Sequence, residues 1–312
     1  MYTMKSALIS GGNGFLGFHL VRKLLSEGFS ITVVDDLSTS KEVLLNSEVE
    51  FCREKVEGFS TTKRYDYVIH LASRPSPEDY SLNPIATMMS NSLGTVRMLD
   101  IALDSGATFL YTSSSEVYGN AAIIPTPESY YGYVNPNGVR SCYDEGKRFS
   151  EAISMAYFRQ HKLDVRIQRP FNVYGPGIRE DGLYGRVIPR FIVQALSGND
   201  ITVHGDGTQT RSFLYVDDWV EATWKFMTMD RLGGTVLNIG SDDEMTINDL
   251  AEITRTITAS GSRIIHTGKR VDDPERRSAD LTNARRILGW QPSTPLKEGL
   301  KKTIDWFRVR KE

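Results

Sequence analysis

Residues 6–17 of the chain read SALISGGNGFLG. The apolar run Ser6–Ser10 is short and stops at glycines, which is typical of a buried strand in a parallel sheet. Apolar residues then recur at helical spacing, at Leu16, Leu20, Leu24 and Leu25. The intervening glycines let the backbone come close to a charged group, and the N-terminus of a helix favours a negative one. The segment therefore predicts an anion-binding turn between a buried strand and a helix.

A second predicted strand, Ile31–Asp35, ends in a carboxylate 18 residues after Gly17. A strand, a glycine turn, a helix and a second strand with a terminal acid form the context that dinucleotide binding requires. The acid is placed to accept hydrogen bonds from ribose hydroxyls. Asp36 beside it would repel a 2′-phosphate, so we expect NAD rather than NADP. The residues predicted to hold NAD in this segment are Gly11, Gly14, Phe15, Leu16, Gly17, Asp35 and Asp36.

Further strands and helices alternate along the first half of the chain, which predicts an α/β fold with a Rossmann-type doubly wound parallel sheet. The other expected strands are Val49–Arg53, Tyr67–Leu71, Thr108–Ser113 and Asp164–Arg169. The expected helices are Pro84–Ser105, broken only by Gly94, and Tyr143–Gln160, which follows an irregular loop over residues 125–138.

The alternation loosens after residue 175. We expect an NAD-binding Rossmann domain over residues 1–175 and a smaller C-terminal α/β substrate lobe over residues 176–312, interleaved and with a soft boundary. The lobe is predicted to contain helices over residues 185–197, 217–229, 247–260 and 295–308 and a strand over Ile201–His204.

The composition is that of an ordinary globular protein, with 40% hydrophobic and 24% charged residues. A net charge of −2 gives no reason to expect a nucleic acid or an anionic membrane as partner. Two cysteines, Cys52 and Cys142, and five scattered histidines form no disulfide framework and no metal-ligand pattern, so we expect no metal. The first apolar run is too short for a signal peptide, and no apolar segment approaches the ~20 residues that span a bilayer. We therefore expect a cytoplasmic protein.

A tyrosine and a lysine stand four residues apart at Tyr143 and Lys147, and this spacing places them on one face of a helix. A phenol titrates near ~10, and a fixed ammonium, helped by the positive end of a nicotinamide, would bring its pKa toward ~7. Such a tyrosine takes a proton from a hydroxyl while hydride leaves the same carbon. An amphipathic helix with a surface lysine contains the same pair. The preceding dinucleotide segment and Ser114, at the end of a predicted strand, favour the catalytic interpretation.

Over essentially its whole length the chain resembles the extended short-chain dehydrogenase/reductase family of nucleotide-sugar enzymes. The resemblance rests on the glycine turn, on Ser114, Tyr143 and Lys147, and on the segments RPFNVYGP (169–176), GTQTRSF (207–213) and LGWQP (288–292). It implies that the first domain carries NAD and that the C-terminal lobe closes on a nucleoside diphosphate. It also implies a homodimer, with the apolar helices over residues 84–105 and 143–160 at the interface.

Within this family the chain is most similar to the UDP-glucuronate decarboxylases, also called UDP-xylose synthases. The similarity rests on LAS (71–73) with Tyr80, SSEVYG (114–119), RSCYDEGKR (140–148) and DDPERR (272–277). It implies that NAD-dependent decarboxylation converts UDP-glucuronate to UDP-xylose through a 4-keto intermediate, with NAD regenerated. The catalytic residues that it implies are Tyr143, Lys147, Ser114, Ser115, Glu116 and Arg277, with Ser115 and Glu116 beside the carboxylate-bearing carbon.

The resemblance also implies binding residues. Further residues expected to contact NAD are Leu71, Ala72, Ser73, Asn91, Tyr143, Lys147 and Pro170. Those expected to bind the substrate are Tyr80, Glu116, Asn172, Arg186, Val187, His204, Arg211 and Arg277. Arg186 and Arg211 are candidates for the diphosphate because arginine forks match it bidentately, although either could be a solvated or ion-paired surface residue.

Four departures from the decarboxylase pattern stand out. Lys55 and Arg74 stand where relatives usually have aspartate and proline; Ser278-Ala279 and Val173 replace a usual Lys-Pro and a common threonine. The alternatives are a nucleotide-sugar 4-epimerase or 4,6-dehydratase, acting for example on UDP-glucose or UDP-glucuronate, and a non-catalytic NAD-binding scaffold on the same fold. Glu116 favours the decarboxylase, because dehydratases place Asp-Glu after the triad hydroxyl and 4-epimerases usually have small or hydroxyl residues there. If strand geometry continues past Ser113, Glu116 faces the same side as Ser114.

Overall fold

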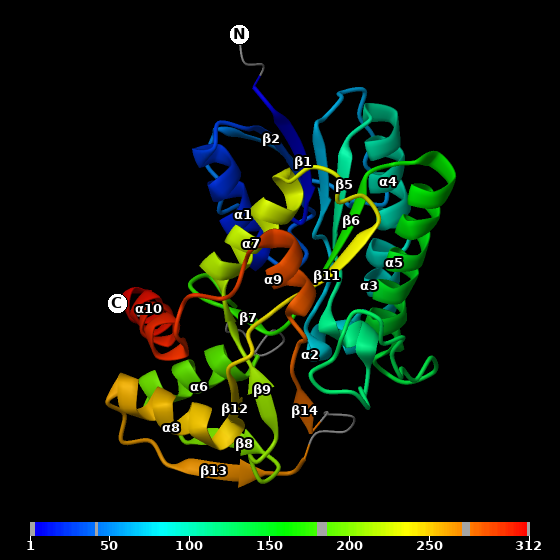
Figure 1. Ribbon diagram of the computed structural model, residues 1–312. Coiled ribbons are helices and arrows are strands. Elements are labelled where there is room, and N and C mark those ends of the chain that lie inside the picture. Colours follow the sequence, from blue (N-terminus) through cyan, green and yellow to red (C-terminus); the bar gives the residue numbers. More distant parts are fainter. Residues whose placement is uncertain (1–3, 41–42, 180–185, 270–274, 311–312) are drawn as a thin grey trace. The chain divides into compact units, whose positions relative to one another are not determined.

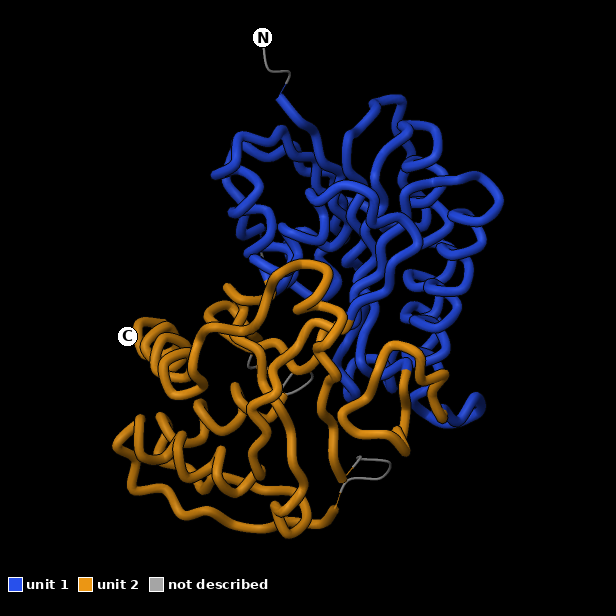
Figure 2. The backbone as a smooth tube through the Cα atoms, viewed as in Figure 1, with its two compact units in different colours: residues 1–117, 134–169, 220–237 blue, residues 118–133, 170–219, 238–312 orange. Residues whose placement is uncertain are grey.

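A computed structural model describes residues 4–40, 43–179, 186–269 and 275–310 of the chain. The chain divides into two compact units, which interleave along the sequence (Figure 2). Unit 1 consists of residues 1–117, 134–169 and 220–237, and unit 2 of residues 118–133, 170–219 and 238–312. This division differs from a single cut at residue 175, because a segment of the first half belongs to unit 2 and a segment of the second half returns to unit 1.

Unit 1 contains the seven-stranded sheet, with the order β11-β6-β5-β4-β1-β2-β3 (Figure 1). Its strands are β1 Ser6–Ser10, β2 Ser30–Val34, β3 Val49–Cys52, β4 Tyr67–His70, β5 Thr108–Thr112, β6 Val165–Pro170 and β11 Thr235–Ile239. The pairings from β3 through β6 are all parallel. The chain leaves β1 toward β2 and later returns to β4 on its other side, so β1 and β4 flank the switch point of a doubly wound sheet. The predicted fold class is confirmed.

Helices cover both faces of this sheet (Figure 1). On one face α4 Leu93–Ser105 lies on β4 and β5, and α3 Pro84–Asn91 and α5 Ser141–His161 pack beside it. On the other face α1 Phe15–Ser26 lies against β2. The Trp224 ring of α7 Val216–Thr228 meets Phe29 at 5.7 Å between ring centroids. The core between sheet and helices includes the fully buried side chains of Leu8, Val68, Leu99 and Phe109.

The break predicted at Gly94 within the helical segment Pro84–Ser105 is wrong, because the helix is interrupted at Ser92 instead, between α3 and α4. Ser92 ends α3 with φ −104° and ψ −78°, and its hydroxyl donates to the Met88 carbonyl at 2.6 Å. A serine that bonds to the carbonyl four residues earlier bends a helix. Gly94 lies within α4, where a Cβ would come 2.6 Å from the Val56 side chain. The glycine therefore allows close packing and does not interrupt the helix.

Unit 2 combines helices with small sheets, in the orders β10-β7, β12-β9-β14 and β13-β8. Its helices are α6 Val187–Leu196, α8 Ile247–Thr258, α9 Thr282–Leu288 and α10 Leu296–Val309. Its strands are β7 Val173–Tyr174, β8 Ile201–His204, β9 Thr210–Ser212, β10 Leu214–Tyr215, β12 Glu244–Thr246, β13 Ile264–Thr267 and β14 Arg276–Arg277. The predicted helices near 185–197, 217–229, 247–260 and 295–308 correspond to α6, α7, α8 and α10. Gly185, the predicted start of the first of these helices, and Asp272–Pro274 lie outside the described residues.

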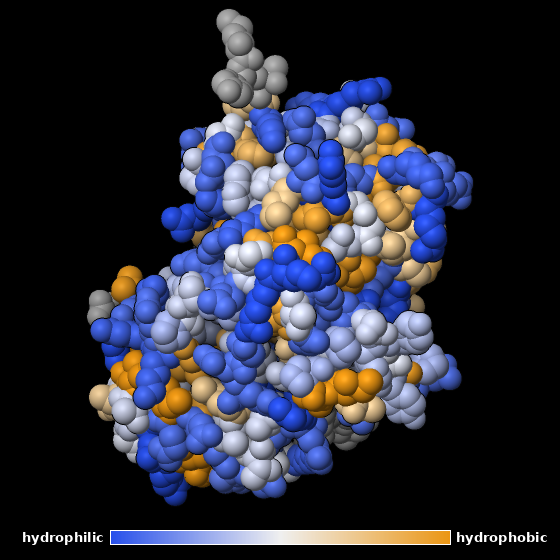
Figure 3. All heavy atoms as spheres, viewed as in Figure 1, coloured by the Kyte–Doolittle hydropathy of each residue, from blue (hydrophilic) through white to orange (hydrophobic). Residues whose placement is uncertain are grey.

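Residues 125–138 are irregular, as predicted, apart from isolated bridges at Thr126 and Tyr133. On the face shown in Figure 3 hydrophilic residues predominate and hydrophobic residues form separate patches. Among the described residues no helix is both long enough and apolar enough to cross a membrane.

Candidate active site

The glycine turn begins directly after the central strand β1. The Gly11 amide donates to the Val34 carbonyl at 2.8 Å, and Gly11 has φ +72°, a left-handed value that favours glycine. A Cβ at Gly11 would lie 2.6 Å from the Ala72 amide nitrogen, and one at Gly17 would lie 2.6 Å from the Gly12 Cα. The turn therefore requires glycine at both positions. The first amides of α1 have no carbonyl partner within the helix, and such amides are suited to bind an anion.

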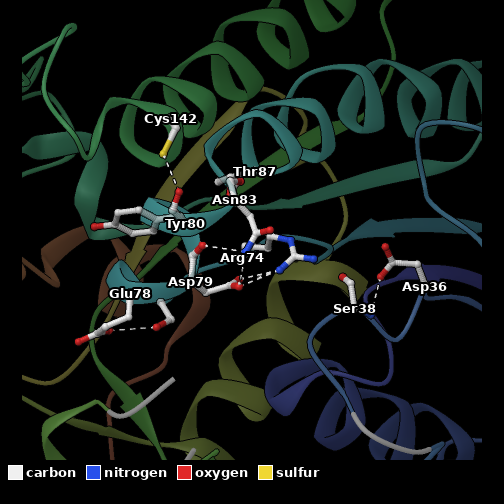
Figure 4. A network of polar contacts seen from close by, with 10 residues as sticks. Asp36, Ser38, Arg74, Glu78, Asp79, Tyr80, Asn83, Thr87 and Cys142 are labelled. Atoms are coloured by element: carbon white, nitrogen blue, oxygen red, sulfur yellow. Dashed lines mark hydrogen bonds and ion pairs between the residues drawn. The ribbon is translucent and has the colours of Figure 1, made fainter. Parts of the chain in front are cut away.

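Two acids follow β2. The Asp35 carboxylate accepts hydrogen bonds from the Asn13 amide at 3.1 Å and from the Leu37 amide at 2.9 Å. Burial raises the pKa of Asp35 in spite of these two hydrogen bonds. Asp36 accepts a hydrogen bond from the Ser38 amide at 2.8 Å (Figure 4). Asp35 therefore holds the glycine turn through Asn13, in addition to the predicted task of binding ribose hydroxyls.

Residues 71–73 leave β4 beside the glycine turn. The Leu71 amide donates to the Ser10 carbonyl at 3.0 Å, and the Ser73 hydroxyl donates to the Asn91 side chain at 3.0 Å. Asn91 in turn packs against α5 at Gly146, where a Cβ would lie 3.1 Å from the Asn91 Cβ. The turn, the acids and residues 71–73 thus surround the switch point of the sheet, where α/β proteins bind ligands. A backbone cradle for a pyrophosphate and carboxylates for ribose hydroxyls fit a dinucleotide.

Tyr143 and Lys147 are both buried on α5, at 5% and 3% exposure. Lys147 Nζ lies 5.8 Å from the centre of the Tyr143 ring and 5.0 Å from that of Tyr111, and it donates to the Thr112 carbonyl at 2.8 Å. Burial lowers the pKa of Lys147 to about 7, against a smaller opposing effect of Glu151. The amine therefore gains and loses its proton near neutral pH, and its titration couples to any charge that forms on the tyrosine.

Glu151 lies one helical turn after Lys147 on α5. Its carboxylate accepts a hydrogen bond from the Ser113 hydroxyl at 2.5 Å and two from the Arg169 guanidinium, at 2.8 Å and 2.5 Å. Glu151 was not predicted as a site residue from the sequence. Its spacing of four residues from Lys147 is the signal that could have identified it. The network places a negative charge near the buried amine and ties α5 to the ends of β5 and β6.

The predicted strand geometry at Glu116 is wrong, because Ser115–Tyr118 forms a 3-10 helix, η1. The Ser114 hydroxyl accepts a hydrogen bond from the Glu116 amide at 3.2 Å, and the Ser114 carbonyl accepts one from the Val117 amide at 3.3 Å. A serine after a strand promotes such a turn by bonding to nearby backbone amides. Ser115 is buried in this turn.

Arg140, the residue before α5, connects η1 to the helix that carries Tyr143. Its guanidinium donates a hydrogen bond to the Glu116 carboxylate and lies 3.6 Å from the Asp144 carboxylate. Neither Arg140 nor Asp144 was predicted as a site residue. The arginine placed three residues before Tyr143 and the acid directly after it were the available signals. Arg140 thus holds Glu116 in the part of unit 1 that contains the tyrosine.

Tyr80 forms one wall of the Tyr143 environment. It lies on α2 Pro77–Leu82, and the two tyrosine rings are stacked, with 5.5 Å between centroids and 12° between planes. Tyr80 is 2% exposed, and its hydroxyl has no hydrogen-bond partner among the residues that the structure describes. Burial raises the pKa of Tyr80, which keeps the phenol neutral. A buried hydroxyl without a partner beside a candidate base is a donor that fits a bound ligand.

The remaining predicted residues belong to unit 2. Arg211 and Arg277 are register partners on the neighbouring strands β9 and β14. Arg211 is buried and donates to the Thr210 carbonyl at 2.7 Å. His204 Nε2 accepts a hydrogen bond from Arg190 at 2.9 Å, so its Nδ1, 2.8 Å from the Thr267 hydroxyl, carries the proton.

The other predicted residues of unit 2 lie at the ends of elements. Asn172 has φ +39° and donates to the Ser212 carbonyl at 2.9 Å. Arg186 is exposed and precedes α6, which begins at Val187, and Pro170 ends β6. The structure thus brings the predicted catalytic residues of unit 1 together around α5, and it pairs Arg211 with Arg277 in unit 2.

Known proteins are similar in sequence to this chain. Residues 7–240 match the family described as the NAD dependent epimerase/dehydratase family. The chain is 41% identical over 314 residues to UDP-glucuronic acid decarboxylase 1 of Xenopus tropicalis, covering 99% of this chain and 73% of the relative. It is 43% identical over 308 residues to UDP-glucuronic acid decarboxylase 5 of Arabidopsis thaliana, covering 97% and 89%.

Solved structures are also similar along the whole chain. UDP-glucose 4-epimerase from Thermotoga maritima, solved with UDP-glucose, has a TM-score of 0.91 and 30% identity, covering 98% of this chain and 100% of the other. MoeE5, solved with UDP-glucuronic acid and NAD, has a TM-score of 0.87 and 28% identity, covering 98% and 99%.

Proposed function

The chain belongs to the NAD dependent epimerase/dehydratase family, and from this premise we propose that it is a UDP-glucuronate decarboxylase, which forms UDP-xylose and CO₂. The observation that carries the proposal is the similarity, over nearly the whole chain, to relatives named UDP-glucuronic acid decarboxylases. Unit 1 would bind NAD and unit 2 the nucleotide sugar. Relative to the interleaved domains expected over residues 1–175 and 176–312, residues 118–133 then belong to the sugar-binding unit and residues 220–237 to the NAD-binding unit.

When bound, NAD supplies a reversible hydride acceptor for C4 of the sugar, so the overall reaction involves no net redox change. The first amides of α1 would hold the pyrophosphate, and Asp35 with Asp36 would hold the ribose. The remaining residues proposed to contact NAD are Gly11, Gly14, Phe15, Leu16, Gly17, Leu71, Ala72, Ser73, Asn91, Tyr143, Lys147 and Pro170.

Tyr143 would take the proton from the C4 hydroxyl, and Ser114 would donate a hydrogen bond to the C4 oxygen as its charge changes. The phenolate that forms on Tyr143 is an opposite charge beside Lys147, and an opposite charge within a few ångströms favours the ammonium form of the buried amine. Because the Lys147 pKa is about 7, a modest interaction protonates it. The two side chains would therefore share one proton during turnover.

A ketone at C4 lies β to the sugar carboxylate, and CO₂ leaves because the ketone accepts the electron pair as an enolate. Glu116, held by Arg140, and Ser115 in η1 would orient the ring and handle reprotonation at C5. The unpartnered hydroxyl of Tyr80 would donate a hydrogen bond to the carboxylate before it is lost.

The nucleotide end of the substrate would bind to unit 2. Arg211 and Arg277 stand on adjacent strands, where two guanidinium groups match a diphosphate or a sugar oxygen. The residues proposed to bind the substrate are Tyr80, Glu116, Asn172, Arg186, Val187, His204, Arg211 and Arg277.

The protein would form a homodimer through α3 and α5. Large apolar side chains are exposed on α3 and at α5: Ile85 at 76%, Met88 at 44%, Met89 at 39% and Phe149 at 45%. An exposed apolar cluster of this kind is typical of an interface. Sedimentation of the protein and of Ile85→Glu at micromolar concentration tests this: a monomeric wild-type protein contradicts it. The free thiols of Cys52 and Cys142 are consistent with a reducing cytoplasm.

The central experiment is incubation of the purified protein with UDP-glucuronate and NAD. Release of CO₂ together with a UDP-pentose is the expected result. A UDP-sugar of unchanged mass would establish a 4-epimerase instead, loss of water a dehydratase, and NAD binding without turnover of UDP-glucuronate or UDP-glucose a scaffold.

A further inference from the structure

Arg74 and Asp79 form an ion pair in the segment that connects β4 to α3 (Figure 4). Arg74 Nη1 donates to both carboxylate oxygens of Asp79, at 2.8 Å and 2.9 Å, and the two side chains are only 16% and 3% exposed. Asn83, which follows α2, donates to the Asp79 carboxylate at 3.1 Å and to its carbonyl at 3.2 Å. The buried carboxylate therefore ties α2 to the residue that follows Ser73.

The next residue on α2 contacts the candidate base. Tyr80 follows Asp79, and its ring is the one stacked on Tyr143. Its carbonyl also accepts a weak hydrogen bond from the Cys142 thiol at 3.6 Å. Tyr80, Cys142 and Tyr143 form one buried cluster. A shift of α2 would therefore change the surroundings of the Tyr143 ring directly.

This helix requires an anchor. α2 has six residues, which is too short for a helix to be stable by itself. A desolvated ion pair adds little net stability, but a guanidinium that donates to both oxygens of a carboxylate allows few alternative geometries. The pair between Arg74 and Asp79 thus defines where α2 lies more than it stabilises the fold.

We propose that Arg74 is a positioning residue for the reaction: by holding Asp79 it fixes α2 so that Tyr80 stays stacked on Tyr143 and keeps water from it. The proposal rests on the proposed function, in which Tyr143 is the base. Arg74 itself touches no reacting atom.

The test compares Arg74→Lys, which keeps the charge but loses the fork, with the double variant Arg74→Leu/Asp79→Leu, which removes both charges together and so leaves no unpaired buried carboxylate. Lys63→Ala, which breaks the exposed ion pair with Glu50, is the control. Each protein is measured with NAD bound, for kcat and KM on UDP-glucuronate across pH, and for hydrogen exchange of residues 77–83.

Both Arg74 variants are expected to lose roughly ten- to a hundredfold in kcat, as small misplacements of a catalytic group do, and KM should rise by a smaller factor because Tyr80 is also proposed to contact the substrate. The pH at which kcat is half-maximal should rise, because water that reaches Tyr143 screens the Lys147 charge.

Hydrogen exchange in residues 77–83 should accelerate in both Arg74 variants, and the control should match the wild type. A raised KM with unchanged kcat would mean that the pair acts in substrate binding and not on the surroundings of Tyr143, and full kcat in the double variant would mean that the pair is dispensable; either result overturns the proposal. If wild-type protein releases no CO₂, the proposed function fails, while the exchange measurement still tests the anchoring of α2.

Discussion

Replacement of Lys147 by methionine should stabilise the NAD-free protein at neutral pH while it removes activity. Burial lowers the Lys147 pKa from the ordinary 10.5 to about 7. Between these two values the unfolded chain binds the lysine proton and the folded protein does not, so the free energy of unfolding of the wild type rises with pH across this window. Methionine carries no proton in either state and is free of this dependence.

The magnitude follows from the two pKa values. The gap between them corresponds to about 4–5 kcal/mol. The free energy of unfolding of the wild type is lower by this amount below pH 7 than at a pH above the ordinary lysine pKa. The methionine variant loses the 2.8 Å hydrogen bond to the Thr112 carbonyl, which costs about 1–3 kcal/mol. We therefore expect a net gain of about 2 kcal/mol at pH 7, no difference near pH 9 and a net loss near pH 10.

The assay is equilibrium urea unfolding of both NAD-free proteins between pH 6 and pH 10. Because other titrating groups are common to the two proteins, the difference between them isolates Lys147. Lys63→Met, at a largely exposed lysine, is the matched control and should show no gain at neutral pH. If the difference in free energy of unfolding between Lys147→Met and the wild type stays constant with pH, burial does not lower the pKa of Lys147 and the reasoning fails.

Three further substitutions test the site. Tyr143→Phe should abolish turnover while NAD still binds, because only the proton-accepting oxygen is lost; activity within about tenfold of wild type, ~1.4 kcal/mol, would show that another group is the base. Glu116→Gln should lower CO₂ release by on the order of 10² to 10⁴ with little change in substrate or NAD binding. If this variant keeps full activity and only its melting temperature falls, because Arg140 has lost a charged partner, the carboxylate is structural. Gly17→Ala should weaken NAD binding by roughly tenfold or more in calorimetric titration, since a Cβ overlaps the turn. Gly58→Ala is the control, because a Cβ there would come no closer than 3.9 Å to its nearest neighbour, the Lys55 carbonyl oxygen, and equal affinities for the two variants would argue against the glycine cradle.

Local sequence patterns were sufficient to predict the elements that surround the glycine turn and the tyrosine–lysine pair. β1 and β8 have the predicted bounds, and α5 extends only two residues before and one after the prediction. These features depend on near neighbours: a strand that stops at glycine, or two side chains one helical turn apart. The prediction of an NAD site also followed from local spacing, because the turn, the helix and the acid are consecutive in the chain.

Other features depend on contacts that no window of sequence contains. β11 was not predicted, because a five-residue strand becomes recognisable only by pairing with β6, far earlier in the chain. The 3-10 turn at Glu116 and the break at Ser92 arise where a serine side chain competes for backbone hydrogen bonds, and alternation or helical period does not reveal which bond wins.

The chemistry of the site shows the same division. The sequence alone determined that Tyr143 and Lys147 share a helix face, because that geometry is intrinsic to residues four apart. Only the tertiary structure decided that burial lowers the pKa of Lys147 to about 7, that Arg140 holds Glu116, and that the Tyr80 ring stacks on Tyr143. Desolvation and ion pairing depend on which distant segments close over a side chain, and that is settled by packing rather than by spacing.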